Sequence, residues 1–375
     1  MSIAPLYLDY NATAPMRPEA LEAFCSAAEQ TGNASSVHAF GRAARKLVEE
    51  SRRCIARCIE ADPAQVIFVS CGTEANATAL GSIINGQKAD NLIVSSVEHP
   101  SVLQAIPETT RTVPVDSSGH LSPATLRETL EDVPEGARVS IMLANNETGI
   151  LQPISEIADV VHAKGGLLHC DAVQALGKLP LSFSQLGADM ISLSAHKLGG
   201  PQGVGALVLR KGLHLEAYLR GGGQEGRRRA GTENVAGIAA FAAAVEAAVA
   251  ELSQFQSLEN AHRKMEERLR NAAPEAVVFG TESERLPNTS CVAMPGVSAE
   301  LQLMALDLEG LAVSSGSACS SGKVEPSHVL TAMGADKTLA ANALRISSGW
   351  ASSPSDLERF SQAWIDIYRR QQRAA

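Results

Sequence analysis

Short apolar runs alternate with helical patterns through the first two-thirds of the chain, and this alternation restricts the possible folds more than any other feature. Candidate strands lie at residues 66–69, 92–95, 140–143, 166–169, 190–194 and 206–209. Candidate helices between and before them lie at residues 42–60, 74–84 and 154–164. Such alternation predicts an α/β fold with a mostly parallel sheet and helices on both faces. A long helical region over residues 233–273 is expected to close this part.

The last third of the chain has a different pattern. Strands are predicted at residues 276–279, 289–293 and 343–347, and helices at 299–307, 326–333 and 354–370. This mixture predicts a smaller α+β module of about 110 residues that the extreme N-terminus joins. A chain of 375 residues commonly forms about two domains. We therefore expect a large α/β domain at residues 15–255 and a small domain made of residues 1–14 and 256–375.

Composition narrows the function classes. The net charge of −9 argues against a nucleic-acid surface, and the one dense basic run, residues 227–229, suits a local anion contact. The N-terminus lacks the basic and apolar regions of a signal peptide. The most apolar helical stretch, residues 235–252, carries Glu246 and Glu251, so no membrane span is expected.

The cysteines point to a reducing compartment. Seven cysteines are an odd number without paired spacing, which is typical of free thiols in a cytoplasmic protein. Cys54 and Cys58 lie one helical turn apart but have no second pair of ligands nearby, so they are predicted to be packing residues and no metal site is expected.

Three features of the α/β part suggest a phosphate-bearing cofactor. Gly72 and Thr73 follow a predicted strand and open a helix, where main-chain N–H groups suit a phosphate. Asp171, with Gln174 three residues later, lies at the carboxyl end of a predicted strand, where it could bind a ligand or cap the next helix. Lys197 ends another strand before a glycine-rich turn. A phosphate cradle, a carboxylate and a lysine are the parts that pyridoxal phosphate requires.

A single cysteine, Cys319, lies within the small polar residues 314–322, SSGSACSSG. Glycine and serine pack little, so we expect a mobile loop that could carry a nucleophile into a site and out again. The alternative is an inert cysteine in an ordinary connection.

These features belong to a longer series of motifs: YLDYNAT at 7–13, GNASSVH at 32–38, VEHP at 97–100, ANNETG at 144–149, HCDAVQ at 169–174, SAHK at 194–197, RAGTEN at 229–234, RLPNT at 285–289, SSGSACSSG at 314–322 and EPSH at 325–328. With these motifs in order, the chain resembles cysteine desulfurases of the NifS/IscS type. These belong to the class V aminotransferase family, within the fold-type I enzymes that use pyridoxal 5'-phosphate. The resemblance covers nearly the whole chain.

The resemblance implies roles for the matching positions. Lys197 would hold the cofactor covalently and move the substrate Cα proton, while His99 would stack on the cofactor ring and assist proton transfer. Asp171 would pair with the pyridine nitrogen and Gln174 with the ring hydroxyl. The remaining cofactor contacts implied are Gly72, Thr73, Asn146, Ser194, His196 and, from a second subunit, Thr232.

The resemblance also implies a reaction. Asn146 and Arg345 would bind L-cysteine, Arg345 through its carboxylate, and the Cys319 thiolate would take the substrate sulfur as a persulfide and leave L-alanine. A homodimer and a sulfur-acceptor protein, either an iron–sulfur scaffold or another sulfur carrier, are the implied partners. Gly199 stands where the family commonly has a bulky His or Tyr, so we expect a less packed turn after Lys197.

Other activities remain open. The same residues would serve a selenocysteine lyase, and the family also includes aminotransferases, although an aminotransferase needs no mobile thiol. A cysteine hydrolase would leave Lys197 without a role. A catalytically silent binding protein would have no reason to retain Lys197, His99, Asp171 and Cys319.

Overall fold

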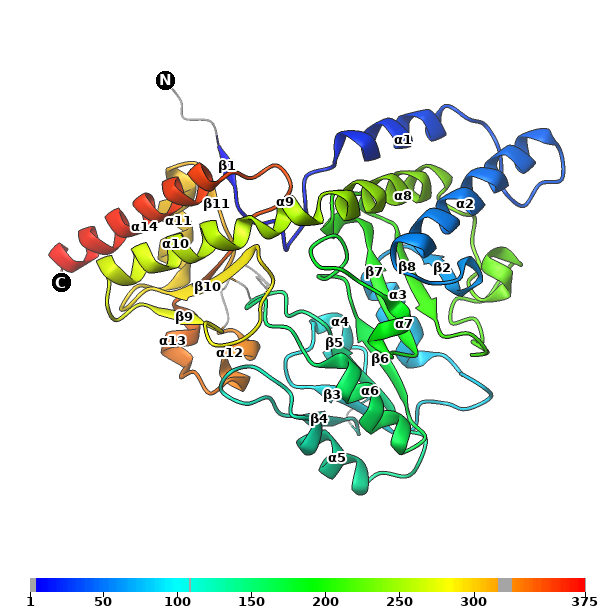
Figure 1. Cartoon of the computed structure of the whole chain (residues 1–375), viewed down its shortest axis with the longest axis horizontal. Helices are drawn as coiled ribbons and strands as arrows, with labels where there is room; N and C mark the ends of the chain where they lie inside the picture. The colour runs from blue at the N-terminus through cyan, green and yellow to red at the C-terminus, as the bar shows by residue number, and fades with distance from the viewer. Residues whose placement is uncertain (1–4, 108, 316–325, 375) are drawn as a thin grey trace.

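The computed structural model describes residues 5–107, 109–315 and 326–374. A large sheet with its helices forms one part of the molecule, and a smaller part built around α10 and α14 lies beside it (Figure 1). Helix α8 (Val235–Ala250) packs on the large part, and the chain then continues through α9 (Leu252–Gln256) into α10 (Leu258–Ala272) of the smaller part.

The large part is built on a seven-stranded sheet in the order β2-β8-β7-β6-β5-β3-β4. All neighbours pair in parallel except β8, which is antiparallel to both β2 and β7. The strands in that order are β2 (Val66–Val69), β8 (Gly205–Leu209), β7 (Met190–Ser194), β6 (Leu167–Asp171), β5 (Arg138–Met142), β3 (Leu92–Ser95) and β4 (Arg111–Val113). Because helices cover the sheet, whole strands such as β2 and β3 are buried, which explains their near-continuous apolar sequence.

The long helices of this part are α1 (Pro18–Ala28), α2 (Ala39–Cys58), α3 (Gly72–Gly81), α5 (Pro123–Glu131), α6 (Ile154–Ala163) and α8. Helices α1 and α2 pack on α8. Helix α8 can be this apolar because most of its residues are buried. Short helices α4 (Pro100–Leu103) and α7 (Phe183–Leu186) and 3-10 turns at Pro63–Gln65, Ala195–Lys197 and Gln224–Arg227 complete the connections.

The smaller part is α+β, as predicted. An antiparallel sheet has the order β12 (Ala343–Ser347), β10 (Thr289–Ala293) and β9 (Val277–Phe279). The N-terminal strand β1 (Leu6–Tyr7) pairs in parallel with β11 (Leu311–Ala312). Helices α10, α11 (Ala299–Leu308), α12 (His328–Ala332), α13 (Lys337–Ala341) and α14 (Pro354–Ala374) surround these strands. Trp364 and Phe360 of α14 are fully buried in this core.

The helical region predicted over residues 233–273 is three helices instead of one. The chain bends by 61° between α8 and the segment that follows it. The two halves serve different cores, since α8 is buried against the large part whereas α10 presents one apolar face to the smaller part. In the described ranges no single helix is long and apolar enough to cross a membrane, although this bent pair passes by length and composition.

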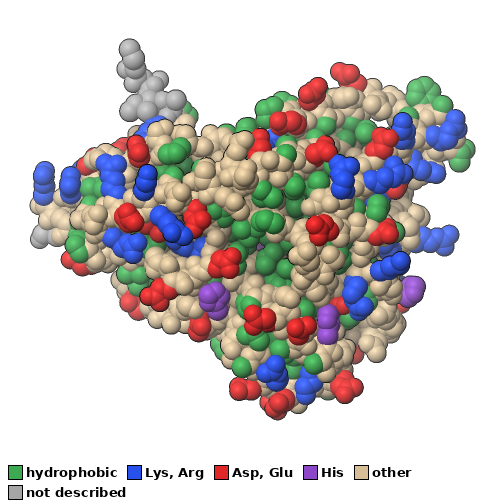
Figure 2. All heavy atoms as spheres, viewed as in Figure 1, with side chains coloured by type: hydrophobic (Ala, Val, Ile, Leu, Met, Phe, Trp, Pro, Cys, Tyr) green, Lys and Arg blue, Asp and Glu red, His purple; other side chains and the backbone are tan. Residues whose placement is uncertain are grey.

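On the visible face, lysine and arginine side chains are mixed with acidic ones over most of the surface, and apolar side chains show between them near the middle of the molecule (Figure 2).

Candidate active site

A cavity of about 210 Å³ opens at the carboxyl ends of the parallel strands. Residues predicted from scattered parts of the sequence line it together: Gly72, Thr73, His99, Asn146, Asp171, Gln174, Ser194, His196 and Lys197. Helix α3, the segment before α4, the loop after β5 and the ends of β6 and β7 supply them. The cavity therefore lies where open α/β sheets bind their ligands.

One end of the cavity consists of hydrogen-bond donors that have no partner among the described residues. Helix α3 begins at Gly72, and the residue before it, Cys71, gives no side-chain cap to the first turn. The N–H groups of Gly72 and Thr73 therefore stay available to a ligand. The Oγ atom of Ser194 is buried and has no partner among the described residues. A Cβ atom at Gly72 would lie 2.9 Å from Val173 Cγ2, so glycine is required for this close approach.

Helix α3 is also held at its far end. The Arg138 guanidinium is buried and its Nη1 atom donates to the main-chain oxygens of Ala79, Leu80 and Ser82 at 2.9–3.0 Å. Burial lowers the pKa of Arg138 to about 10. A cation at the C-terminus of a helix interacts favourably with the negative end of the helix dipole. The positive end of the α3 dipole faces the cavity.

The carboxylate of Asp171 is buried at the end of β6. Its Oδ2 atom accepts a hydrogen bond from Asn76 Nδ2 at 2.7 Å, and its Oδ1 atom accepts one from the Val173 N–H at 3.0 Å. The second bond is the turn-capping contact that the sequence also allowed. Asp171 therefore caps the following turn and lines the cavity at the same time.

Lys197 follows β7 in the turn predicted to hold it. Its Nζ atom donates to the main-chain oxygens of Asn11 at 2.7 Å and Ala12 at 2.8 Å. Burial, and after it the positive charge of Arg345, lower the pKa of Lys197 to about 8, against the opposing effect of Asp171 and Asp9. A lysine with this pKa is partly neutral near pH 8 and can act as a nucleophile or a base.

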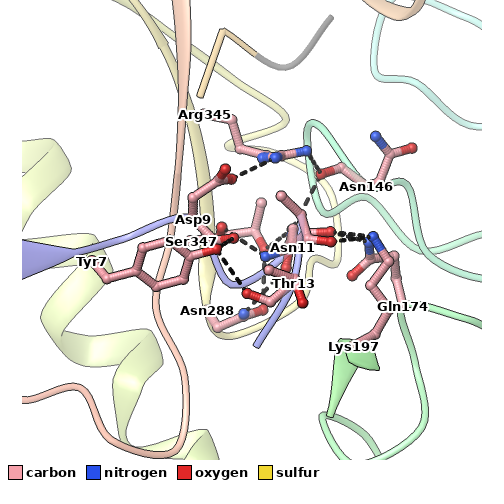
Figure 3. Close-up of polar contacts among 12 residues, drawn as sticks. Tyr7, Asp9, Asn11, Thr13, Asn146, Gln174, Lys197, Asn288, Arg345 and Ser347 are labelled. Carbon is pink, nitrogen blue, oxygen red and sulfur yellow. Dashed lines mark hydrogen bonds and ion pairs between the residues drawn. The ribbon is translucent and has the colours of Figure 1, made fainter. Parts of the chain in front are cut away.

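A second lysine, which the sequence did not suggest, lies beside the first. Lys178 is buried, and its Nζ atom donates to Gln174 Oε1 at 2.5 Å and to Asn11 Oδ1 at 2.7 Å. Gln174 Nε2 in turn donates to the main-chain oxygen of Asn11 at 2.9 Å. Burial and the charge of Lys197 hold the pKa of Lys178 well below its usual value. Figure 3 shows Asn11 on the N-terminal segment, with Gln174 and Lys197 to its lower right.

Arg345 approaches the cavity from β12 of the smaller part. Its Nη2 atom lies 2.6 Å from Asp9 Oδ1, and its Nη1 atom donates to the main-chain oxygen of Asn146 at 3.1 Å (Figure 3). Its buried Nε atom has no partner among the described residues. The main chain of Arg345 exchanges two hydrogen bonds with Ser314, the residue at which the predicted cysteine loop begins.

Two histidines at the cavity are held by short side chains. His196 Nδ1 lies 3.2 Å from Thr13 Oγ1, and burial lowers the pKa of His196 to about 4. His99 stands before α4, and its Nδ1 atom lies 2.8 Å from Ser101 Oγ. Burial lowers the pKa of His99 as well. Both imidazoles are therefore neutral at pH 7.

Three predicted residues do not line the cavity of this chain. Arg345 reaches it only through its hydrogen bond to the main-chain oxygen of the lining residue Asn146. Thr232 is exposed on the loop before α8 and does not line the cavity. Cys319 lies outside the described residues. The chain after that segment is fixed to residues next to the cavity lining. Ser327 Oγ donates at 2.5 Å to buried Glu147, the neighbour of Asn146, and His328 Nε2 lies 3.0 Å from the main-chain oxygen of Glu98, the neighbour of His99.

The expectation of a less packed turn after Lys197 was wrong. Gly199 has a φ of +96°, and a Cβ atom there would lie 2.6 Å from Arg17 Cγ. The buried Arg17 side chain fills this space, donates to the Leu198 oxygen at 3.0 Å and pairs with Glu251 at 2.6 Å. Glycine is needed here because another part of the chain supplies the bulk.

Comparisons with known proteins agree with this architecture. Residues 6–360 match the family described as aminotransferase class-V. A cysteine desulfurase of Cereibacter sphaeroides is 41% identical over 364 residues, which are 94% of this chain and 93% of that protein. The cysteine desulfurase IscS of Dictyoglomus turgidum is 39% identical over 94% of this chain and 91% of its own.

A solved structure has the same fold. The NifS-like protein of Rickettsia africae superposes with a TM-score of 0.89 at 31% identity, covering 97% of this chain and 99% of its own. The predicted α/β fold with its large, mostly parallel sheet is thereby confirmed. By sequence, by fold and by the extent of the match, this chain belongs to the class-V aminotransferase family.

Proposed function

We propose that this protein is a cysteine desulfurase that depends on pyridoxal 5'-phosphate. It would move the sulfur of L-cysteine to the thiol of Cys319 and release L-alanine. The observation that carries the proposal is one cavity with an amine of lowered pKa, Lys197, near the buried guanidinium of Arg345. Relatives at about 40% identity that are named cysteine desulfurase support the same reaction.

The residues present fit the cofactor. The phosphate would lie on the open N–H groups of Gly72 and Thr73 and the unpartnered Ser194 Oγ, with His196 beside it. Asp171 would face the pyridine nitrogen, and Gln174 the ring hydroxyl. Lys197 would bind the cofactor covalently. Once bound, the cofactor supplies an electron sink next to the substrate Cα atom.

The substrate would bind between the two parts of the molecule. Arg345 would take the carboxylate of L-cysteine by the bidentate geometry that a guanidinium favours, with Asn146 beside it. The amine of Lys197 would remove the Cα proton, since its lowered pKa leaves a useful fraction neutral near pH 8.

The sulfur transfer balances without an external oxidant. The Cys319 thiolate forms a bond to the substrate sulfur while the bond between that sulfur and Cβ breaks. The carbon skeleton keeps the electron pair, gains a proton and leaves as L-alanine, and Cys319 becomes a persulfide. Release of the sulfur then requires an acceptor, which we infer to be an iron–sulfur scaffold or another sulfur-carrier protein.

The proposal includes a homodimer and a reducing compartment. Thr232 is exposed on this chain, so it is free to reach the cofactor phosphate of a second copy. A persulfide cycle needs free thiols, and the described cysteines Cys25, Cys54, Cys58, Cys71, Cys170 and Cys291 are unpaired. Both points favour a cytoplasmic homodimer.

The test is a visible absorption spectrum followed by measurement of alanine and sulfide released from L-cysteine with dithiothreitol. We expect a yellow protein that forms alanine, a Cys319→Ala variant that stays yellow but forms none, and a Cys25→Ala control with full activity, since Cys25 is an exposed cysteine on α1.

Three outcomes would contradict the proposal. Full turnover of Cys319→Ala would indicate a different reaction with the same cofactor, such as transamination. A colourless protein that cannot be reconstituted would reject the cofactor. A far higher kcat/KM for selenocysteine than for cysteine would identify a selenocysteine lyase.

A further inference from the structure

The ring nitrogens of His99 have different surroundings. The main-chain N–H of Ser101 donates to His99 Nδ1 at 3.1 Å. A main-chain nitrogen can only donate, so Nδ1 must offer a lone pair. Nε2 makes no hydrogen bond to a described residue, and the side chain lines the cavity. A neutral imidazole whose Nδ1 is unprotonated carries its proton on Nε2.

A chain of hydrogen bonds from Asp171 imposes the same arrangement. Asn76 Nδ2 donates to Asp171 Oδ2 at 2.7 Å and to Ser101 Oγ at 2.9 Å. A carboxylate accepts hydrogen bonds only, so the amide nitrogen of Asn76 must face it. The reverse orientation would place two oxygens 2.7 Å apart. The amide oxygen of Asn76 is buried and has no partner within the described ranges, so it does not oppose this orientation.

The direction of the next bond follows. Ser101 Oγ accepts from Asn76, and its own proton can then point to His99 Nδ1, which is 2.8 Å away. Two donors from Ser101, its N–H and its O–H, therefore meet the same ring nitrogen. Donors on this lone pair stabilise the neutral ring, because protonation of Nδ1 would break both bonds.

The charged groups around His99 do not reverse this preference. Burial lowers its pKa most, and Lys197, His328 and Arg345 lower it further, whereas Asp171 alone raises it. The ring is thus neutral on electrostatic grounds and oriented on geometric grounds.

We propose that Asn76 and Ser101 are positioning residues that hold His99 as the neutral imidazole protonated on Nε2. A ligand that enters the resting cavity then meets a hydrogen-bond donor, the Nε2–H group of His99. Removal of the substrate proton is left to Lys197. The meaning of this arrangement for catalysis rests on the proposed function, but the position of the proton does not.

The experiment is ¹⁵N NMR of the full-length protein, with its cofactor bound and with selectively labelled histidine. His99→Gln identifies the two His99 signals by their loss. We expect an unprotonated Nδ1 and a protonated Nε2 from about pH 7 to about pH 9. Ser101→Ala removes the O–H donor but keeps the main-chain N–H, so Nε2 should stay the protonated nitrogen while the Nδ1 signal shifts and the pKa of His99 rises by about 0.5 to 1, since one hydrogen bond to the neutral form is lost. Ser101→Thr, which keeps the hydroxyl, should restore the wild-type spectrum.

A matched control is Ser96→Ala, because the Ser96 hydroxyl lies nearby in sequence and is buried without a partner in the described structure. It should leave the His99 signals unchanged. The signals of buried His169 and His262 report whether each variant is folded. A wild-type His99 protonated on Nδ1, or a folded Ser101→Ala variant with a wild-type spectrum, would overturn the inference. Absence of alanine formation would instead reject the proposed function and leave the tautomer to be read independently.

Discussion

The two ends of the cavity differ in how their polar groups are occupied. At the α3 end, the N–H groups of Gly72 and Thr73 receive no cap from Cys71, and Ser194 Oγ has no partner in the described structure. Beside the lining residue Asn146, at what we call the Arg345 end, the Arg345 guanidinium already contacts Asp9 and the Asn146 oxygen. A ligand gains hydrogen bonds at the first end, whereas at the second both Nη atoms of Arg345 already bond to the protein and Nε alone has no partner among the described residues.

The difference follows from the elements that build each end. A helix start leaves unpaired N–H groups wherever no side chain caps it. A buried guanidinium cannot stay without a counter-charge, because an unpaired buried charge is costly. Asp9 supplies that charge from the N-terminal segment. The comparison teaches that the α3 end is ready for an anion, while the Arg345 end is neutral until a second carboxylate arrives.

The largest effect is expected at the Arg345 end. Arg345→Ala removes the charged donors for the substrate carboxylate, and hydrogen bonds to charged groups contribute about 1.5–3 kcal/mol. KM for L-cysteine should rise by about 10- to 100-fold while the cofactor stays bound, as initial rates and the absorption spectrum will show. Arg345→Lys should recover part of the loss. A variant that loses colour together with cysteine binding would show that the two ends are not separable.

A pH series sharpens the comparison through Lys197, which lies between the ends. Its amine must be neutral to attach the cofactor, and its pKa is lowered to about 8. The neutral fraction, and with it the rate of cofactor loading into cofactor-free protein, should rise about tenfold between pH 7 and pH 9 and then level off. Stopped-flow absorbance measures this rate. A rate that keeps rising to pH 10 would mean an ordinary lysine.

A smaller effect is expected at the α3 end. Ser194→Ala removes one donor that bonds to nothing else in residues 5–107, 109–315 and 326–374, and such a bond contributes about 0.5–1.5 kcal/mol. The Kd for pyridoxal phosphate should rise by about two- to tenfold, with KM for cysteine unchanged once the cofactor is saturating. Equilibrium dialysis gives the Kd. Because no internal bond is broken, thermal unfolding of the cofactor-free variant should match wild type, and a marked loss of stability would contradict the open-donor description.

The smallest expected effect tests directly whether the substrate carboxylate must replace Asp9 at Arg345. Asp9→Asn keeps an oxygen near Arg345 Nη2 but removes the negative charge that a substrate carboxylate must displace. KM for L-cysteine should fall by about two- to fivefold, since a charged partner is replaced by a neutral one. The loading curve of Lys197 should also move to lower pH, because Asp9 raises its pKa. A higher KM would show that Asp9 orients Arg345 for the substrate instead of competing with it.

Much of the fold follows from local sequence. Strands such as β2, β7 and β12 are short apolar runs bounded by polar residues, and the sequence predicts them at the observed bounds. Strand β4 was not predicted from the sequence, because only one of its three residues is buried. The break after α8 was not predicted because the helical pattern of the sequence continues across it. The bend depends on which of the two cores each half of the helical region packs against.

The site divides in the same way. Residues at strand ends and the helix start could be predicted, since topology alone brings them to one edge of the sheet. Asn76, Ser101 and Lys178 could not, because their importance lies in contacts with distant segments. A buried lysine is also rare, so Lys178 reads as a surface residue by composition. The one local sign was its place four residues after Gln174.

The anchor that Arg138 provides for α3 has a practical consequence for protein engineering. The position of this helix is fixed from its far end, by main-chain contacts on the other side of about 15 Å of helix. The residues beside the expected phosphate, Cys71 among them, do not make this anchoring contact. Libraries at Cys71 and Thr73 could therefore retune affinity for altered cofactors while the scaffold that presents them stays intact.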